Sequence, residues 1–220
     1  MSEWKLQDDL TEAQLAAWIA KPEIAIDTEL HGLRLGRDRV LLVQVGDEDG
    51  NAALVRTAGK TECPPRLRKL LEAPNVVKLF HFALTDIAFL EDSFGVRVRP
   101  FFCTRTASKL IRTYTQSHGL KDVVREFLGI QMDKEQQQSD WSRPDLSPQQ
   151  LQYAANDVLY LVAVYRRLQE MINARGMLPG GRTARELCED SMKALAVHVE
   201  LCLAGYGGSD DGWKIDLFQH

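Results

Sequence analysis

The order of the apolar segments constrains the fold of this chain more than any other feature of its sequence. Three short apolar runs follow one another at residues 23–27, 39–46 and 51–55, and an acidic turn, 47–50, separates the last two. Such runs are typical of buried strands, and a short turn ending in glycine between two of them predicts a hairpin. A further apolar run at 76–80 lies between two helical patterns. The chain therefore begins as a strand meander and continues with alternating strands and helices.

Amphipathic patterns predict helices in most of the remaining chain. Two of them begin at capping boxes, in which a hydroxyl residue is followed three positions later by glutamine: Thr11 with Gln14, and Ser147 with Gln150. The predicted helices cover residues 11–20, 66–73, 83–95, 104–128 (two helices), 147–172 and 184–203. The polar stretch 132–146 has no hydrophobic period and predicts a loop. This order predicts an α/β fold in which helices flank a β-sheet of mixed direction.

Composition places the chain among soluble globular proteins. Its 220 residues are 45% hydrophobic and show no internal repeat or linker, so a single domain is expected over 1–220, with a helix and tail over 184–220. The net charge of −4 argues against tight, nonspecific coating of duplex nucleic acid. Four scattered cysteines without a C-x-x-C pair argue against zinc and suit reduced thiols. Without a long apolar run or a signal-peptide core, we expect no membrane span and a cytoplasmic location.

Two carboxylates stand at the end of the first long apolar run. Asp27 and Glu29 are two residues apart, and because strand side chains alternate, both point to one side of the sheet. Carboxylates placed side by side repel each other unless a cation lies between them. The alternative is chance, since the chain has 31 acids. Asp47 and Asp49 form a similar pair, which we expect to be solvated in a turn.

Three further residues carry chemistry on predicted helices. Asp86 is a lone acid in a nearly apolar helix that follows a strand; alternatively it is an ordinary acid at a helix start. Tyr153 and Asp157 are four residues apart and share one side of a later helix. Both residues lie beside the main apolar stripe of that helix. The alternative to a functional role is that Tyr153 is an ordinary interfacial tyrosine and Asp157 an ordinary surface acid.

Taken together, Asp27, Glu29, Asp86 and Asp157 form a set of oxygen donors suited to Mg²⁺ or Mn²⁺. Two such ions, about 3.5–4 Å apart, can activate a water and stabilise the leaving oxygen of an in-line phosphoryl displacement. Tyr153 has a reference pKa too high for a base at neutral pH and is better suited to orient the attacking water.

At these residues the sequence resembles the ribonuclease D-like exonucleases of the DEDD superfamily, in the branch that carries a tyrosine in its last motif. The three motifs read IAIDTEL, KLFHFALTDIAFL and QLQYAANDVLYL, the last with the branch's Y-x-x-x-D spacing. The stretches GLKDVVREFLGI and QQQSDWSRPDLSPQQL are also similar to segments that precede the last motif in this family. The resemblance extends from about residue 23 to residue 168.

The resemblance implies a ribonuclease H-like fold and metal-dependent hydrolysis of RNA from a free 3′ end, releasing nucleoside 5′-monophosphates. It also implies that the four carboxylates hold two ions of Mg²⁺ or Mn²⁺ and that Tyr153 orients the water. Family members often carry helical nucleic-acid-binding domains after the nuclease. About fifty residues follow the third motif here, too few for such domains, which would be consistent with a weak grip on substrate.

Four residues are candidates for contact with the terminal nucleotide. Leu30 and His31 follow the first-motif acids, where a side chain can press against the terminal base. Phe82 stands where the family often has asparagine, so an aromatic ring that stacks on a base replaces a polar contact. His81 either contacts the substrate or is a half-buried histidine that bonds to backbone.

The sequence leaves open whether the substrate is RNA or DNA and whether the fold is catalytically active. The same chemistry can act on single-stranded DNA, and no residue decides the choice of sugar. The second alternative is a catalytically inactive fold that binds nucleic acid. The presence of all four carboxylates and the tyrosine argues against it. Seven basic residues in the middle of the chain are either a solvated surface or a track for phosphates: Arg97, Arg99, Arg105, Lys109, Arg112, Lys121 and Arg125.

Overall fold

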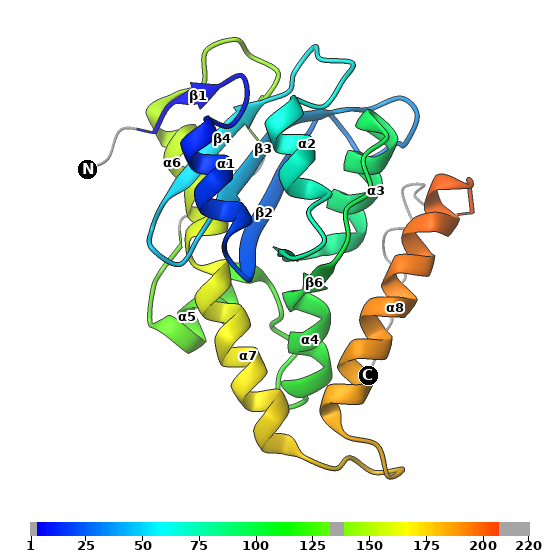
Figure 1. Ribbon diagram of the computed structural model, residues 1–220. Coiled ribbons are helices and arrows are strands. Elements are labelled where there is room, and N and C mark those ends of the chain that lie inside the picture. Colours follow the sequence, from blue (N-terminus) through cyan, green and yellow to red (C-terminus); the bar gives the residue numbers. More distant parts are fainter. Residues whose placement is uncertain (1–3, 133–138, 207–220) are drawn as a thin grey trace.

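A six-stranded mixed sheet forms the centre of the computed structural model, which describes residues 4–132 and 139–206 (Figure 1). The spatial order of the strands is β1-β4-β3-β2-β5-β6. Strands β2, β3 and β4 form an antiparallel meander, β5 and β6 continue the sheet parallel to β2, and β1 pairs parallel with β4. The strands are β1 (Leu6–Gln7), β2 (Glu23–Leu30), β3 (Val40–Gly46), β4 (Ala52–Arg56), β5 (Val77–Phe80) and β6 (Phe101–Cys103).

This topology confirms the predicted mixed sheet and the hairpin between the second and third apolar runs. Strands β1 and β6 were not predicted. They are two and three residues long, too short to show a period of two in the sequence, and their pairing with β4 and β5 defines them.

Helices cover both faces of the sheet, with one hydrophobic cluster on the first face and two on the second. Helices α1, α2 and α3 pack on one face, while α6 and α7 cover the other, with α4 and α5 against α7. Helix α8 packs against α3, α4 and α7 at the side of the molecule (Figure 1). The helices are α1 (Glu12–Ile19), α2 (Pro65–Leu71), α3 (Ala83–Phe94), α4 (Thr104–Ile111), α5 (Leu120–Leu128), α6 (Pro148–Leu159), α7 (Leu161–Arg175) and α8 (Ala184–Leu203).

The alternation of side chains along β2 decides where its acids point. Ile24 and Ile26 are fully buried in the cluster beneath α1, α2 and α3, whereas Ala25 belongs to a cluster on the opposite face. Asp27 and Glu29 share the face of Ala25, because successive side chains of a strand alternate. The two acids therefore lie on the face that α6 and α7 cover.

The predicted long helix over 147–172 is wrong in one respect, because the chain forms two helices, α6 and α7, that meet at Tyr160. The sequence has neither glycine nor proline there, and the backbone of Tyr160 departs from helical values, with φ −101° and ψ −9°. Helix α6 packs on β2, β3 and β4, whereas α7 packs on β2 and β5 and against α4, α5 and α8. Because the two halves are buried against different surfaces, tertiary packing bends the chain where local sequence gives no signal.

Asp47 also differs from its predicted solvated state. Its side chain is buried and accepts hydrogen bonds from Trp18 Nε1 at 2.9 Å and from the backbone N–H groups of Asp49 and Asn51. The acid therefore stabilises the β3–β4 turn and ties it to α1. The predicted loop over 132–146 contains no helix or strand at residue 132 or at 139–146, and its remainder lies outside the described residues, as does the tail over 207–220.

Candidate active site

Three of the predicted carboxylates meet between β2 and α6. One carboxylate oxygen from each of Asp27, Glu29 and Asp157 lies within 4.8 Å of the others, and all three side chains are half-buried. The capping box of Ser147 and Gln150 fixes the start of α6, so that Asp157 lies near its C-terminal end. Residues 130 positions apart in sequence thus form one group of oxygen donors.

Asp86 reaches the same region from the first turn of α3. Its side chain is buried, and the Thr28 hydroxyl donates a 2.6 Å hydrogen bond to its Oδ1. Thr28 lies between Asp27 and Glu29 on β2 but points to the opposite face of the strand. The charge of Asp27 helps to raise the pKa of Asp86, and the charge of Asp86 acts in the same way on Glu29 and Asp157. All four carboxylates therefore influence one another.

The electrostatics of this cluster favour a bound cation. Burial raises the pKa of Asp27 to about 7, and burial followed by the charge of Asp27 raises the pKa of Glu29, Asp86 and Asp157 well above the usual range. Within residues 4–132 and 139–206, no lysine or arginine forms an ion pair with any of the four. Because the donors are all oxygens, the cluster fits Mg²⁺ or Mn²⁺ and suits zinc poorly.

Tyr153 lies one helical turn before Asp157 on α6, close enough for the charge of Asp157 to act on its phenol. Burial, together with the charges of Asp157 and Glu29, raises the pKa of Tyr153 far above its ordinary value. The phenol is therefore protonated at neutral pH and able to donate a hydrogen bond. The ring of Trp141 packs beside that of Tyr153, with 6.1 Å between centroids, and covers it from the preceding loop.

Three residues at this site were not identified from the sequence: Thr28, Trp141 and Gln44. Gln44 is fully buried on β3 opposite Asp27, and its Nε2 donates to Glu29 Oε1 at 3.4 Å. A signal for it exists, since Gln44 is a polar residue within the otherwise apolar run VLLVQVG. Thr28 and Trp141 carry no comparable signal in the sequence. The partner of Thr28 is Asp86, which lies 58 positions later in the chain. The partner of Trp141 is Tyr153, which lies in a different element.

Leu30 and His31, the predicted substrate residues of the first motif, have surroundings that differ from those of the carboxylates. Leu30 is half-buried and packs against the hydrophobic cluster beneath α1, α2 and α3. A bulge between Glu29 and Leu30 interrupts the strand at this point. The His31 side chain is 64% exposed, with its Nδ1 3.6 Å from Asp38 Oδ1. Contact of Leu30 or His31 with a terminal base stays a prediction.

Both ring nitrogens of His81 have partners within the protein. Nδ1 lies 2.9 Å from Thr104 Oγ1, and Nε2 lies 2.9 Å from the backbone oxygen of His118. Burial lowers the pKa of His81 to about 3, so the ring is neutral. A carbonyl oxygen can only accept, so Nε2 carries the proton, while Nδ1 lies against the Thr104 hydroxyl, which donates to the Phe80 backbone oxygen at 3.0 Å. These contacts favour the alternative of a structural histidine, and substrate contact stays a prediction.

Phe82 begins α3 in an unusual backbone conformation. Its φ of 86° is left-handed, and among the described residues no other non-glycine residue has a positive φ. Such strain is typical of positions that the surrounding structure holds for a purpose. The guanidinium of Arg105 lies 4.5 Å from the centre of the half-buried ring. Stacking of Phe82 on a base stays a prediction.

The basic middle of the chain is mostly tied into the fold rather than left as a solvated surface. Arg112 is fully buried and pairs with Glu126, and Arg99 pairs with Glu91. Further ion pairs engage Arg97 with Glu200 and Arg125 with Asp122. Four of the seven basic residues are therefore engaged in ion pairs within the fold, and contact of this region with phosphates stays a prediction.

A glycine brings α6 close to the sheet. A Cβ added to Gly46 would lie 2.8 Å from Val158 Cγ2 and 3.2 Å from the Val158 backbone carbonyl carbon. Real Cβ atoms are essentially never found 2.8 Å from another heavy atom, and the carbonyl carbon of Val158 belongs to the helix backbone, which cannot rotate away as a side chain can. Since Val158 follows Asp157 directly, Gly46 sets how near Asp157 comes to Asp27 and Glu29.

We expect Gly46→Ala to lower the melting temperature by several degrees and to weaken binding of Mg²⁺. Overpacking of this kind typically costs about 1–3 kcal/mol, and each kcal/mol shifts the melting temperature of a chain this size by about 2–4 °C. Thermal denaturation and calorimetric titration measure the two effects. Gly119→Ala is the control, because its Cβ would meet only the end of the Asp122 side chain. A normal melting temperature and normal metal binding for Gly46→Ala would contradict this role.

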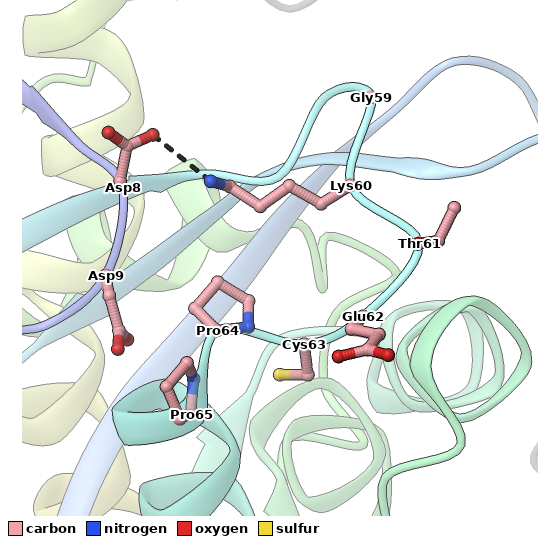
Figure 2. A pocket seen from close by; sticks show the side chains of 9 residues that line it. All are labelled: Asp8, Asp9, Gly59, Lys60, Thr61, Glu62, Cys63, Pro64 and Pro65. Carbon is pink, nitrogen blue, oxygen red and sulfur yellow. Dashed lines mark hydrogen bonds and ion pairs between the residues drawn. The ribbon is translucent and has the colours of Figure 1, made fainter.

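Two concavities elsewhere on the molecule contain none of the predicted site residues. One, of about 400 Å³, lies between the β1–α1 connection and the segment that precedes α2 (Figure 2). Three of its four charged groups have partners within the fold, because Lys60 bonds to Asp8 at 3.1 Å and Asp9 accepts from the backbone of Arg66 and Leu67 at the start of α2. The other, of about 490 Å³, lies beside α1 and the β3–β4 turn. The cluster of Asp27, Glu29, Asp86 and Asp157 therefore remains the candidate active site.

Membrane insertion finds no support in the helices that the structure describes, since none of them combines the length and apolarity needed to cross a bilayer.

Comparison with known proteins gives these residues a family context. A family of 3′-5′ exonucleases matches residues 4–173 of the chain. Ribonuclease D of Sphingobium indicum is 33% identical over 172 residues, which are 78% of this chain and 44% of the relative. DNA polymerase I of Aquifex aeolicus is 36% identical over 152 residues, which are 69% of this chain and 24% of the polymerase. The chain thus spans less than half the length of these two relatives.

Solved structures extend the likeness over the whole chain. NrnC of Brucella melitensis with bound Mg²⁺ is 35% identical, with a TM-score of 0.83 and full coverage of both chains. The same protein bound to pGG is 36% identical, with a TM-score of 0.83 and coverage of 98% of this chain and 97% of that one. The mixed sheet and its flanking helices confirm the predicted ribonuclease H-like fold. From the family match and this shared fold, together with the three motifs, it follows that the chain is a ribonuclease D-like member of the 3′-5′ exonuclease family.

Proposed function

We propose that this chain hydrolyses RNA stepwise from a free 3′ end and releases nucleoside 5′-monophosphates. The observation that carries the proposal is the convergence of Asp27, Glu29 and Asp157, with Asp86 beside them, around a site that no described basic residue neutralises. A family match to 3′-5′ exonucleases and similarity to a protein named ribonuclease D support RNA as the substrate.

The four carboxylates would hold two divalent ions, with Mg²⁺ supported by the similarity to NrnC solved with that ion. When bound, such ions lower the pKa of water and stabilise negative charge on the phosphate and on the leaving oxygen. Thr28 restrains the carboxylate of Asp86 through its 2.6 Å hydrogen bond to Oδ1. β2 and α6 supply the remaining ligands from rigid elements, so their mutual positions are set before substrate arrives.

Tyr153 has the geometry of a residue that orients the attacking water. Its phenol is protonated and lies one helical turn from Asp157. A hydrogen bond donated to one lone pair of the water would leave another lone pair directed at the phosphorus, which lowers the barrier mainly through orientation. Trp141 fixes the ring by packing beside it. The tyrosine therefore acts by position rather than as a base.

A DNA substrate is the second candidate, and the 36% identity to DNA polymerase I of Aquifex aeolicus favours it. The same carboxylates and tyrosine would serve both substrates, because the reacting phosphodiester is common to RNA and DNA. A contact to the 2′-hydroxyl can come from backbone as well as from a side chain, so the choice must be measured on matched RNA and DNA oligomers.

The test uses 5′-labelled RNA and DNA oligomers that end in either a 3′-hydroxyl or a 3′-phosphate. We expect a ladder of shortened RNA from the 3′-hydroxyl substrate with Mg²⁺ or Mn²⁺, and none after chelation. A 3′-phosphate should block the reaction, because its added charge would face the carboxylate cluster. A 5′-phosphate should have no such effect.

Shortening from the 5′ end, or cleavage of a circular RNA, would contradict the proposed polarity. Full activity after exhaustive chelation and dialysis would contradict metal dependence. Faster shortening of the DNA ladder than of the RNA ladder would assign the second candidate instead of the first.

A further inference from the structure

Gln44 is a polar residue in a strand that is otherwise apolar and wholly buried. All seven residues of β3 are buried, and the Gln44 side chain has no exposed surface. Its cross-strand neighbours are Asp27 on β2 and Leu54 on β4. An uncharged polar group in such a place normally destabilises a fold unless all its hydrogen bonds are made. An apolar residue would suit the packing of this position better.

The hydrogen bonds of Gln44 are only half made. Its Nε2 donates to Glu29 Oε1 at 3.4 Å, while its Oε1 has no donor among the described residues. The opposite orientation of the amide would place Oε1 against a carboxylate oxygen, where two acceptors repel. The orientation with Nε2 toward Glu29 is therefore the favoured one. The side-chain carbonyl oxygen of Gln44 is therefore buried and unpaired, while one N–H of the same amide is directed at Glu29.

We propose that Gln44 is a positioning residue for Glu29 and that it selects the carboxylate orientation that binds a divalent cation. This inference rests on the proposed function of the site. Glu29 has more rotatable bonds than the aspartates and comes just before the bulge in β2. A single N–H directed at Oε1 restricts the rotation of this carboxylate without adding a competing positive charge. A lysine or arginine at position 44 would instead neutralise the site and weaken metal binding.

The proposal predicts that stability and metal affinity respond in opposite directions. Gln44→Met has a similar length but neither donor nor acceptor, so it removes the unpaired carbonyl from an apolar setting. Without metal, we expect its melting temperature to equal or exceed that of the wild type. Its affinity for Mg²⁺ or Mn²⁺ should fall by about 10–100-fold, the effect typical of removing a hydrogen bond to a metal ligand.

The experiment measures the melting temperature in chelator, Mn²⁺ binding by calorimetry, and RNA hydrolysis across a range of Mn²⁺ concentrations. Hydrolysis by Gln44→Met should recover when Mn²⁺ is raised, because weakened metal binding is overcome by concentration. Leu42→Met is the matched control, since Leu42 is also buried on β3 and is the cross-strand partner of Glu29. We expect it to leave metal affinity unchanged. Gln44→Leu serves as a second variant if Gln44→Met folds poorly.

A lower melting temperature with unchanged Mn²⁺ affinity in both Gln44 variants would overturn the inference and make Gln44 a packing residue. Failure of the proposed function has a different signature. If wild-type protein binds no Mn²⁺, or if Asp27→Asn binds it as tightly as wild type, the metal site itself is wrong. Comparing wild type and Asp27→Asn with the Gln44 variants therefore separates the two outcomes.

Discussion

Asp27→Asn should lower RNA hydrolysis by more than about 10²-fold, the scale typical of losing one preorganised electrostatic group. Asp27 lies at the centre of the cluster, because its charge acts on each of Glu29, Asp86 and Asp157. The substitution keeps the shape of the side chain and removes one of its two oxygen donors. Metal affinity should fall with it, and Asp157→Asn should behave in the same way.

The metal-free Asp27→Asn protein should melt at the same temperature as the wild type or slightly higher. Burial makes an ionised Asp27 unfavourable in the folded state, which the raised pKa of its carboxyl expresses, and the charge of Asp27 disfavours ionisation of the neighbouring carboxylates. A neutral amide relieves both effects. Thermal denaturation in chelator measures the change, and end-labelled RNA measures activity. The control is Asp49→Asn, which removes an exposed acid paired with Lys21 and should alter hydrolysis little. Normal cleavage by Asp27→Asn would refute the metal-site assignment.

Tyr153→Phe should slow the chemical step by about 10²–10⁴-fold, the range typical of a positioned proton-transfer or hydrogen-bonding group. Its phenol is kept protonated by burial and by the charges of Asp157 and Glu29. Removing the hydroxyl leaves the ring against Trp141 and leaves the four carboxylates in place. Substrate affinity should therefore change little, because the lost interaction forms mainly in the transition state.

Single-turnover kinetics on a short RNA at saturating enzyme separate the rate of the chemical step from binding. Tyr165→Phe is a suitable control, since Tyr165 is a half-buried tyrosine on α7 whose ring packs against Phe102. It loses the same hydroxyl away from the carboxylates. If Tyr153→Phe and Tyr165→Phe both retain wild-type rates, Tyr153 is a packing residue and the water must be oriented by another group.

Several elements could be predicted from the sequence because their signals are local. The capping box of Thr11 and Gln14 precedes α1, and that of Ser147 and Gln150 precedes α6, as expected. The last helix occupies the predicted range Ala184–Leu203. The hairpin of β3 and β4 follows from two apolar runs joined by a short acidic turn, and the apolar run before them forms β2. In each case interactions between residues within a few positions of one another favour the observed local structure.

Elements whose stability depends on distant partners escaped prediction. β1 and β6 have only two and three residues and exist because β4 and β5 supply their hydrogen bonds. The break at Tyr160 arises because α6 and α7 are buried against different surfaces. Asp47 is buried because Trp18, 29 residues earlier, donates to it.

The sequence by itself determined the chemistry of this protein: which residues are oxygen donors, which share a face of β2 or a turn of α6, and which metals such donors suit. These properties depend on side-chain type and on spacings within one element. Tertiary structure decided whether the donors meet. It brings Asp157 to Asp27 by allowing α6 to approach the sheet at Gly46, and it directs Gln44 at Glu29. Such contacts join residues far apart in the chain, so no local pattern encodes them, and only the packing of the whole fold fixes their distances.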